Sequence, residues 1–186
     1  MHFPLRKGAA IAALLMSFAS PALAQDWQVD HTQSSLKFEA KQSGNIVTGT
    51  FGNWNAKIDF DTDNLKASNI QVRIDMTSVQ TGNATIDQTL LNSDWFDTSN
   101  FTSASFVSTK ITKRENGNFE AAGTLTIRNR SQPLSLPFSL TVEDGVATVS
   151  GATTVLRTDY ELGMAQPDNA VAGKVSILFA LKARKS

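Results

Sequence analysis

The amino-acid sequence predicts an all-β domain, a barrel or a sandwich of about eight to ten antiparallel strands. Apolar and polar residues alternate with a period of two over much of the chain, as in "SSLKFEAKQ", "WNAKIDFD" and "NIQVRIDM". Turn-forming pairs such as the Asp-Gly at 144–145 separate these segments. Each segment is therefore predicted to be a strand with one face in the core and one face in solvent.

Two turns set the expected register of the hairpins. The Asp-Gly turn at 144–145 joins "PLSLPFSLTVE" to "VATVSGATTVL", and a two-residue loop there places Leu140 opposite Val149, so the two apolar faces agree. The Asn-Gly turn at 116–117 behaves differently, because a two-residue loop would put Phe119 on the polar face of the preceding strand. We therefore predict a longer or bulged turn at this second position.

The first 24 residues have the features of a secretory signal peptide. Arg6 and Lys7 precede the apolar run "AAIAALLMSFAS", and a small-residue site, "ALA", ends at Ala24. The apolar run is shorter than the roughly 20 residues that a membrane-spanning helix needs. We therefore expect residues 1–24 to be removed and residues 25–186 to be exported as one soluble domain.

The composition of the expected mature chain narrows the classes of partner. Removing Arg6 and Lys7 from the 17 basic residues leaves 15 against 17 acidic ones, a formal charge of −2, with no strong basic cluster. A nucleic-acid partner is therefore not expected. The chain has no cysteine, so its stability must come from packing, and metal sites built on thiolates are excluded.

Residues that could carry catalysis are few. His31 is the single histidine of the expected mature chain, and its place before the first long strand predicts a surface residue. Asp59, Asp61 and Asp63 resemble the spacing of a calcium loop but lack the downstream glycine and glutamate, so turn formation explains them better. The sequence thus predicts no catalytic residue, no metal site and no required cofactor.

One segment departs from the strand pattern. In "NATIDQTLLNSD" the apolar residues recur at helical spacing, and Asn83 is placed to cap a helix of two or three turns. Trp95, Phe96 and Phe101 follow in a predicted loop. Leaving these aromatic rings in water would forgo roughly 1.5 to 3 kcal/mol each, so the segment must cover something. It either completes the core of a barrel or closes over a ligand, since barrels of about eight strands can enclose one small molecule.

Four longer segments, in order along the chain, carry a resemblance to a known family. They are "SLKFEAKQSGNIVTGTFGNWNAKIDFD", "SVQTGNATIDQTLLNSDWFDTSNFTSASFVSTKI", "AAGTLTIRNRSQPLSLPFSLT" and "VLRTDYELGM". Over essentially all of residues 25–186 the chain resembles the YceI-like family of bacterial periplasmic lipid-binding proteins. The resemblance implies a lipocalin-like, eight-stranded antiparallel barrel with a short helix in the long connection over the barrel mouth.

The same resemblance implies a periplasmic location and a non-enzymatic function. Family members bind polyisoprenoids, isoprenoid quinones or fatty amides, and some accompany membrane cytochromes of the b561 type; a dimer is possible. Many relatives carry an arginine and a histidine where this chain has Ile86 and Thr89. A neutral quinone or fatty amide is therefore expected here more than a pyrophosphate.

Candidate ligand-binding residues follow from the inward faces of the predicted strands and helix. The apolar candidates are Phe38, Phe51, Trp54, Phe60, Val72, Ile74, Leu90, Trp95, Phe96, Phe106, Leu125, Phe138 and Phe179. Arg157 and Asp159 either form an ion pair that fixes a turn or contact a polar head group, and Asn83 and Asp87 either cap the helix or do the same.

The expected function is therefore binding, transport or sequestration of an isoprenoid-like amphiphile. Two alternatives stay open at this point. A sugar-binding sandwich would use exposed tryptophan and aspartate residues of "NSDWFD", and a structural or partner-binding accessory protein would have a filled core.

Overall fold

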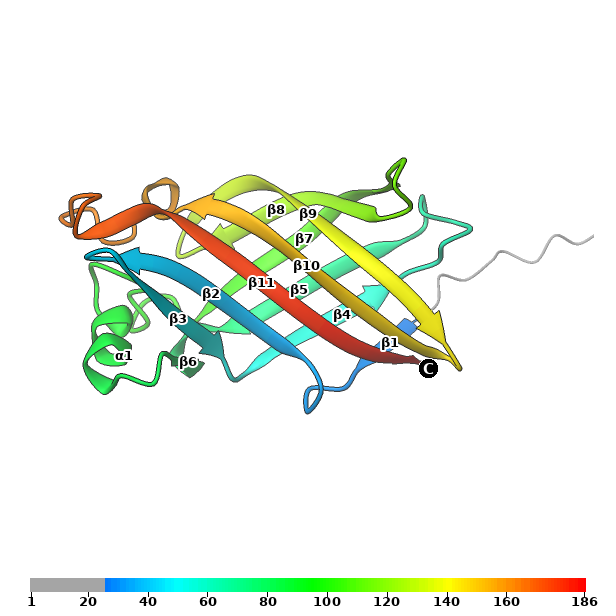
Figure 1. The fold of residues 1–186 in the computed structure, drawn as a ribbon, viewed down its shortest axis with the longest axis horizontal. Helices are drawn as coiled ribbons and strands as arrows, with labels where there is room; N and C mark the ends of the chain where they lie inside the picture. The colour runs from blue at the N-terminus through cyan, green and yellow to red at the C-terminus, as the bar shows by residue number, and fades with distance from the viewer. Residues whose placement is uncertain (1–25) are drawn as a thin grey trace, which may run out of the picture.

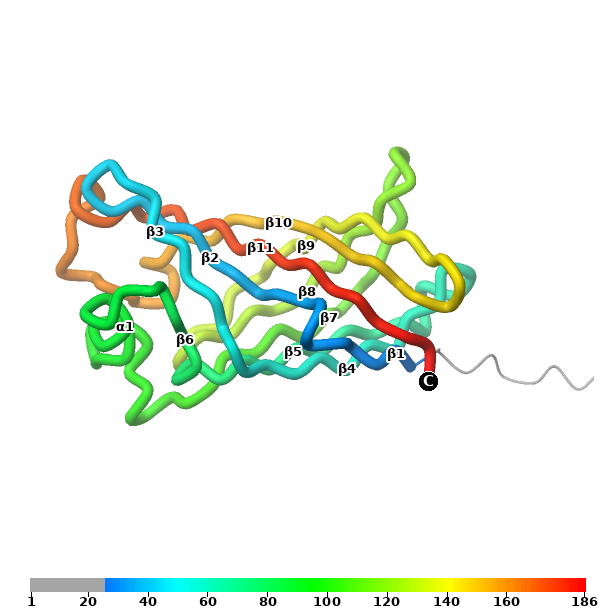
Figure 2. The backbone as a smooth tube through the Cα atoms, turned by 60° about the horizontal axis from the view of Figure 1, so that its bottom comes forward, coloured from blue at the N-terminus to red at the C-terminus, as the bar shows by residue number. Residues whose placement is uncertain are grey.

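The computed structural model describes residues 26–186, which form a closed antiparallel barrel of eight strands (Figures 1 and 2). The predicted signal peptide lies outside the described residues. The helical segments are η1 Met76–Ser78, α1 Ala84–Leu91 and η2 Arg157–Tyr160. The strand segments are β1 Asp26–Val29, β2 Ser35–Gln42, β3 Asn45–Phe51, β4 Trp54–Asp59, β5 Asn69–Asp75, β6 Val79–Gln80, β7 Ser103–Lys113, β8 Phe119–Ile127, β9 Arg130–Glu143, β10 Val146–Leu156 and β11 Val171–Lys185.

Strand pairing closes the barrel through the first and last strands. The sheet order is β1-β4-β5-β7-β8-β9-β10-β11-β2-β3-β6, and β1 also pairs with β11, so Trp27 has Ile58 on one side and Lys185 on the other. Both β1 and β2 pair with β11 and together act as one bent strand, while β3 and β4 act as the next. The sandwich alternative is therefore wrong, because one continuous sheet closes on itself.

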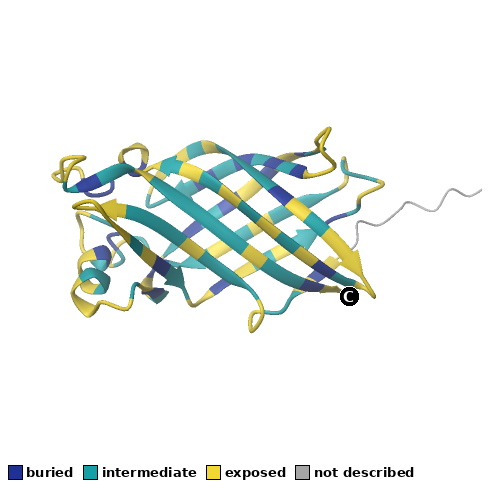
Figure 3. Cartoon of the chain, in the orientation of Figure 1, coloured by how far each residue is buried: buried dark blue, intermediate teal, exposed yellow. Residues whose placement is uncertain are grey.

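The predicted alternation of buried and exposed residues is confirmed (Figure 3). Strand β10 has the bounds of the segment "VATVSGATTVL", and Leu140 lies opposite Val149 across the Asp-Gly turn. In β8, Phe119, Ala121, Gly123 and Leu125 are buried while the alternate residues Glu120, Ala122 and Thr124 are partly exposed. Apolar side chains from every strand of the barrel thus face one enclosed interior.

The hairpin between β7 and β8 has the predicted irregularity. Lys113 pairs with Phe119, so residues 114–118 form a turn longer than two residues. The register then shifts between Ser108 and Lys110, which marks a β-bulge. This bulge keeps both Phe106 and Ile111 of β7 on the inner face, where each is buried.

The two ends of the barrel differ, and both are visible in Figure 1. We call the end covered by α1, the β2–β3 turn and the loop 161–170 the mouth. We call the opposite end, with the turns 114–118 and 144–145 and the C-terminus, the floor. At the mouth, the Ser43 backbone N–H donates to the Ala170 carbonyl at 2.9 Å, which joins two of its loops. Within residues 26–186 no helix combines the length and apolar character needed to span a bilayer.

Candidate ligand-binding cavity

The interior of the barrel holds two adjoining apolar cavities. The deep lobe, near the floor, has a volume of about 140 Å³, and every residue that lines it is apolar. The mouth lobe has a volume of about 270 Å³ and extends beneath α1 and η2. Four residues line both lobes and form the waist between them: Leu36, Ile74, Leu125 and Ile177.

Glycines in the wall explain part of this open volume. Phe38 of β2 pairs with Gly49 of β3, and a Cβ atom on Gly49 would lie 2.2 Å from the Phe38 ring. Phe179 of β11 pairs with Gly151 of β10, where a Cβ atom would lie 2.4 Å from the ring. Because glycine has no Cβ, these rings lie against the neighbouring strand. The lumen therefore stays open although many aromatic side chains face it.

Three phenylalanines close the floor. Phe60 meets Phe119 edge to face at a centroid distance of 5.3 Å, and Phe119 stacks on Phe138 at 5.6 Å. The buried Trp27 indole N–H donates to the Phe60 carbonyl at 2.9 Å, which fixes the loop after β4 against this cluster. All four side chains are at most 8% exposed. The deep lobe thus ends in an apolar wall.

Helix α1 and the loop after it cover the mouth, as predicted. The Asn83 side chain accepts hydrogen bonds from the backbone N–H groups of Thr85 and Ile86, which confirms the predicted N-cap. Leu90 and Phe96 are buried, and both line the mouth lobe. The segment therefore covers the cavity rather than lying free in solvent.

Aromatic contacts join this cover to the barrel wall. The Phe96 ring lies 6.1 Å from the ring of Phe51 in β3, and Phe51 in turn lies 5.8 Å from Phe38 in β2. Trp95 lines the mouth lobe as well and packs over Gly163 of the loop after η2, where a Cβ atom would lie 2.7 Å from the indole.

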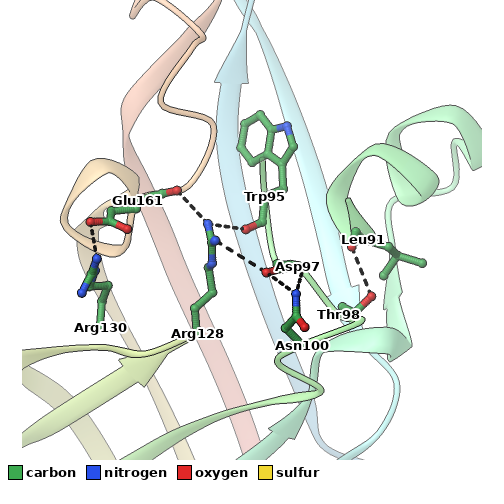
Figure 4. A network of polar contacts seen from close by, with 8 residues as sticks. All are labelled: Leu91, Trp95, Asp97, Thr98, Asn100, Arg128, Arg130 and Glu161. Atoms are coloured by element: carbon green, nitrogen blue, oxygen red, sulfur yellow. Dashed lines mark hydrogen bonds and ion pairs between the residues drawn. The ribbon is translucent and has the colours of Figure 1, made fainter. Parts of the chain in front are cut away.

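Arg128, in the turn between β8 and β9, fastens the cover to the barrel (Figure 4). Its guanidinium donates to the carbonyl oxygens of Glu161 at 3.1 Å and Trp95 at 3.4 Å. It also lies 3.7 Å from the Asp97 carboxylate and 5.8 Å from the centroid of the Phe101 ring. One side chain thus contacts both the loop after α1 and the loop after η2, which together close the mouth.

Arg157 contacts the mouth loop 161–170 from inside the barrel. It is 2% exposed, and its guanidinium donates five hydrogen bonds, at 2.6 to 3.3 Å, all to backbone carbonyls. The accepting residues are Leu162, Gly163, Gln166, Val171 and Ala172. Arginine has five N–H donors, so every one has a protein partner. The positive charge is therefore held by carbonyl dipoles that the loop directs toward it.

The predicted ion pair between Arg157 and Asp159 is wrong. Arg157 instead lies 3.7 Å from Asp168, whose side chain is 81% exposed, and 6.0 Å from the centroid of the Trp95 ring. Asp159 is exposed, and its backbone carbonyl accepts a hydrogen bond from the Gln132 side-chain amide at 3.2 Å. The reason is geometric: η2 turns the Arg157 side chain into the loop 162–172 and leaves Asp159 on the outside.

Asp87 also has a structural partner. Its carboxylate accepts hydrogen bonds from the Thr81 backbone N–H at 2.7 Å and the Thr81 hydroxyl at 2.6 Å, which ties α1 to the chain before it. Asn83, Asp87 and Asp159 do not line the cavity.

The residues considered for chemistry have other roles. Asp61 accepts from the Asp63 backbone N–H at 2.9 Å, which is the predicted turn. His31 is exposed and packs edge to face on Trp54 at 4.6 Å. Within residues 26–186 no three histidine, cysteine, aspartate or glutamate side chains gather closely enough to hold a metal ion.

All thirteen apolar candidates line the cavity; their contact with a ligand stays a prediction. The deep lobe is lined by Trp54, Phe60, Val72, Ile74, Phe106, Leu125, Phe138 and Phe179. The mouth lobe is lined by Phe38, Phe51, Leu90, Trp95 and Phe96, together with Ile74, Leu125 and Arg157.

Sequence reasoning missed several lining residues. Ile58, Leu136 and Ile177 lie on the inner faces of strands, and the period-two pattern was sufficient to find them. Tyr160 and Leu162 also line the mouth lobe and are buried. They belong to η2 and the loop after it, where no periodicity marks an inward position.

A closed eight-stranded barrel with an apolar cavity under a helical cover has the architecture of a lipocalin-type barrel. Comparison with known proteins gives the family. Residues 27–183 match the YceI-like domain, and the chain therefore belongs to the YceI-like family.

Individual relatives are distant in sequence and close in fold. A UPF0312 protein of Vibrio cholerae is 28% identical over 125 residues, which span 66% of this chain and 66% of that protein, just under two thirds of its length. BcnA of Burkholderia cenocepacia superposes with a TM-score of 0.80 at 25% identity, covering 83% of this chain and 99% of BcnA. A polyisoprenoid binding domain of Saccharophagus degradans, implicated in plant cell wall breakdown, gives 0.69 at 16% identity, covering 88% and 99%.

Proposed function

We propose that this protein is a non-enzymatic periplasmic carrier that encloses the tail of an isoprenoid-like amphiphile in its two-lobed cavity. The observation that carries the proposal is an apolar interior that side chains leave unfilled, closed at the floor and covered at the mouth. The polyisoprenoid binding of the related Saccharophagus domain supports the same class of ligand.

The cavity has a suitable size for such a tail. Lobes of about 140 and 270 Å³, at about 30 Å³ for each water-sized unit, hold on the order of a dozen carbon atoms. Burial of each methylene contributes about 0.8 kcal/mol, so a tail of about three isoprene units gains on the order of 10 kcal/mol before ordering costs. Contact with apolar walls is therefore sufficient for binding without a cofactor or a covalent bond.

The distribution of polar groups gives the ligand a direction. The deep lobe is lined by apolar residues alone, whereas polar residues line only the mouth lobe. A polar head group in the deep lobe would lose its hydrogen bonds to water without replacement. The tail therefore points to the floor and the head group stays at the mouth. If the cargo is an isoprenoid quinone, a membrane cytochrome of the b561 type is a suitable partner.

Filling the cavity tests this proposal. In Gly49→Ala the three atoms nearest to the new methyl group all belong to the Phe38 ring, the closest at 2.2 Å, so we expect the ring to turn into the mouth lobe. We expect binding of farnesylacetone, a ketone with a three-isoprene tail, to weaken about tenfold, since the lost space excludes about two carbons. Displacement of the fluorophore N-phenyl-1-naphthylamine would measure it.

Gly52→Ala is the matched control. Gly52 follows β3 on the same edge, and a Cβ atom there would lie 3.7 Å from the nearest atom, an ordinary contact. Equal affinities of the two variants, both folded, would show that the mouth lobe does not hold the ligand. A wild-type protein that binds no apolar probe at all would instead favour an accessory role in contact with a protein partner.

A further inference from the structure

The polar groups at the mouth lobe fall into two sets. The exposed set lies at the rim, where water competes for its hydrogen bonds; it comprises Lys37, Gln42, Thr85 and Thr89. The buried set is Arg157 and Tyr160, which are each 2% exposed. A head group that leaves water and enters the lobe must find its partner in the buried set, because an unpaired polar group there is costly.

Arg157 has no free N–H group with which to bind a head group. All five of its N–H groups donate to backbone carbonyls of the mouth loop. A ligand that took one of these donors would break an existing hydrogen bond to a loop carbonyl, so little would be gained. Arg157 therefore shapes the lobe without binding the head group directly.

Tyr160 differs from Arg157 in this respect. Within residues 26–186 its hydroxyl has no hydrogen-bond partner, and no side-chain oxygen or nitrogen is both sealed and unpaired. The hydroxyl of this buried residue therefore has accessible surface, and Tyr160 is one of the residues that line the mouth lobe. The protein thus holds a free O–H donor at the boundary between the apolar cavity and the rim.

The charge state of this donor is fixed. Burial, with a smaller contribution from the negative charge of Asp159, raises the pKa of Tyr160 to about 12. The phenol therefore stays protonated at physiological pH and presents a neutral O–H group.

We propose that the Tyr160 hydroxyl donates a hydrogen bond to a neutral acceptor oxygen, such as a ketone, quinone or amide carbonyl, on the head group of the enclosed amphiphile. This inference rests on the proposed carrier function and adds a selecting residue to it. An anionic head group fits less well, because the two buried side chains of the lobe offer it one neutral donor and no free cationic N–H. Selection is thus for carbonyl heads on apolar tails.

The experiment compares two probes on three proteins. The probes are farnesylacetone and the matching hydrocarbon without the ketone oxygen, and displacement of N-phenyl-1-naphthylamine measures both affinities. The proteins are the wild type, Tyr160→Phe, which removes only the hydroxyl, and Thr148→Val, which removes an exposed hydroxyl of β10 that lines neither lobe.

We expect Tyr160→Phe to weaken ketone binding about fivefold to tenfold, the value of one hydrogen bond, and to leave hydrocarbon binding unchanged. Thr148→Val should change neither affinity. The unchanged hydrocarbon affinity also shows that Tyr160→Phe is folded.

The possible outcomes distinguish a failure of the Tyr160 inference from a failure of the carrier proposal on which it rests. If Tyr160→Phe binds both probes as the wild type does, or loses both equally, the hydroxyl does not select the head group and the carrier proposal stands alone. If the wild type binds neither probe, the carrier proposal fails and this inference fails with it.

Discussion

The floor and the mouth close the same barrel by different means. At the floor, the rings of Phe60, Phe119 and Phe138 pack on one another. At the mouth, two arginines donate hydrogen bonds to loop carbonyls and hold a cover made of α1 and two loops. Aromatic packing excludes water permanently, whereas hydrogen bonds of loops can exchange with water. Under the carrier proposal, this difference predicts that the ligand enters and leaves at the mouth.

The largest effect is expected from removing the central side chain of the mouth. Arg157→Ala removes a buried guanidinium and its five hydrogen bonds to backbone carbonyls, of which the Gly163 carbonyl keeps the Gln166 backbone N–H as a partner, so we expect a loss of about 5 kcal/mol in the free energy of unfolding. Arg130→Ala is the control, since its pair with Glu161 is exposed and should be worth less than about 1 kcal/mol. Urea titration measures both, and equal losses would contradict the structural role of Arg157.

A somewhat smaller effect is expected at the floor. Phe138→Ala removes a ring that is 7% exposed and packs on both Phe60 and Phe119. We expect a loss of about 3 to 4 kcal/mol and a deeper cavity that accepts longer tails. Val142→Ala, in the same strand but 49% exposed, should cost little. Tail preference that stays the same in Phe138→Ala would show that the ligand does not reach the floor.

The smallest loss of stability is expected for a variant that should show the clearest change in the rate at which the ligand leaves the cavity. Asp97→Asn removes the charge that faces Arg128 at 3.7 Å and one of the two carboxylate oxygens that accept from the Asn100 side-chain amide, and should cost about 1 to 2 kcal/mol. Asparagine tolerates the positive φ of 51° at this position, so the backbone is preserved. We expect probe dissociation to become several-fold faster, measured by stopped-flow fluorescence.

Glu120→Gln gives the comparison at the opposite end. Glu120 pairs with Arg114 beside the turn 114–118 at the floor, so its loss should leave the dissociation rate unchanged. If both variants release the probe equally fast, the mouth is not the route of exit and the contrast between the two ends has no kinetic meaning.

Features set by local sequence were predictable. Alternation within each strand determines which side chains face inward, so the apolar lining residues and the bounds of β10 followed from the sequence. The cap of α1 depends on Asn83 and two backbone groups next to it, and it was predicted for the same reason. A longer or bulged turn between β7 and β8 was also expected, and residues 114–118 form it, whereas the bulge within β7 at Ser108 to Lys110 was not predicted.

Features set by contacts between distant segments were not predictable. Arg157 bonds to carbonyls up to 15 residues away, in a loop whose path the sequence pattern does not define. The open volume of the cavity depends on rings that lie over glycines of neighbouring strands, which requires the pairing of Phe38 with Gly49 to be known. The free hydroxyl of Tyr160 depends both on the path of this loop and on the open volume of the cavity.

Native mass spectrometry of the protein, exported to a periplasm and purified gently, tests the central claim most directly. The carrier proposal predicts one stoichiometric adduct of lipid mass, which organic extraction would release and identify as an amphiphile with a neutral carbonyl head. A bare protein mass that persists after incubation with a quinone and a prenyl lipid would contradict it.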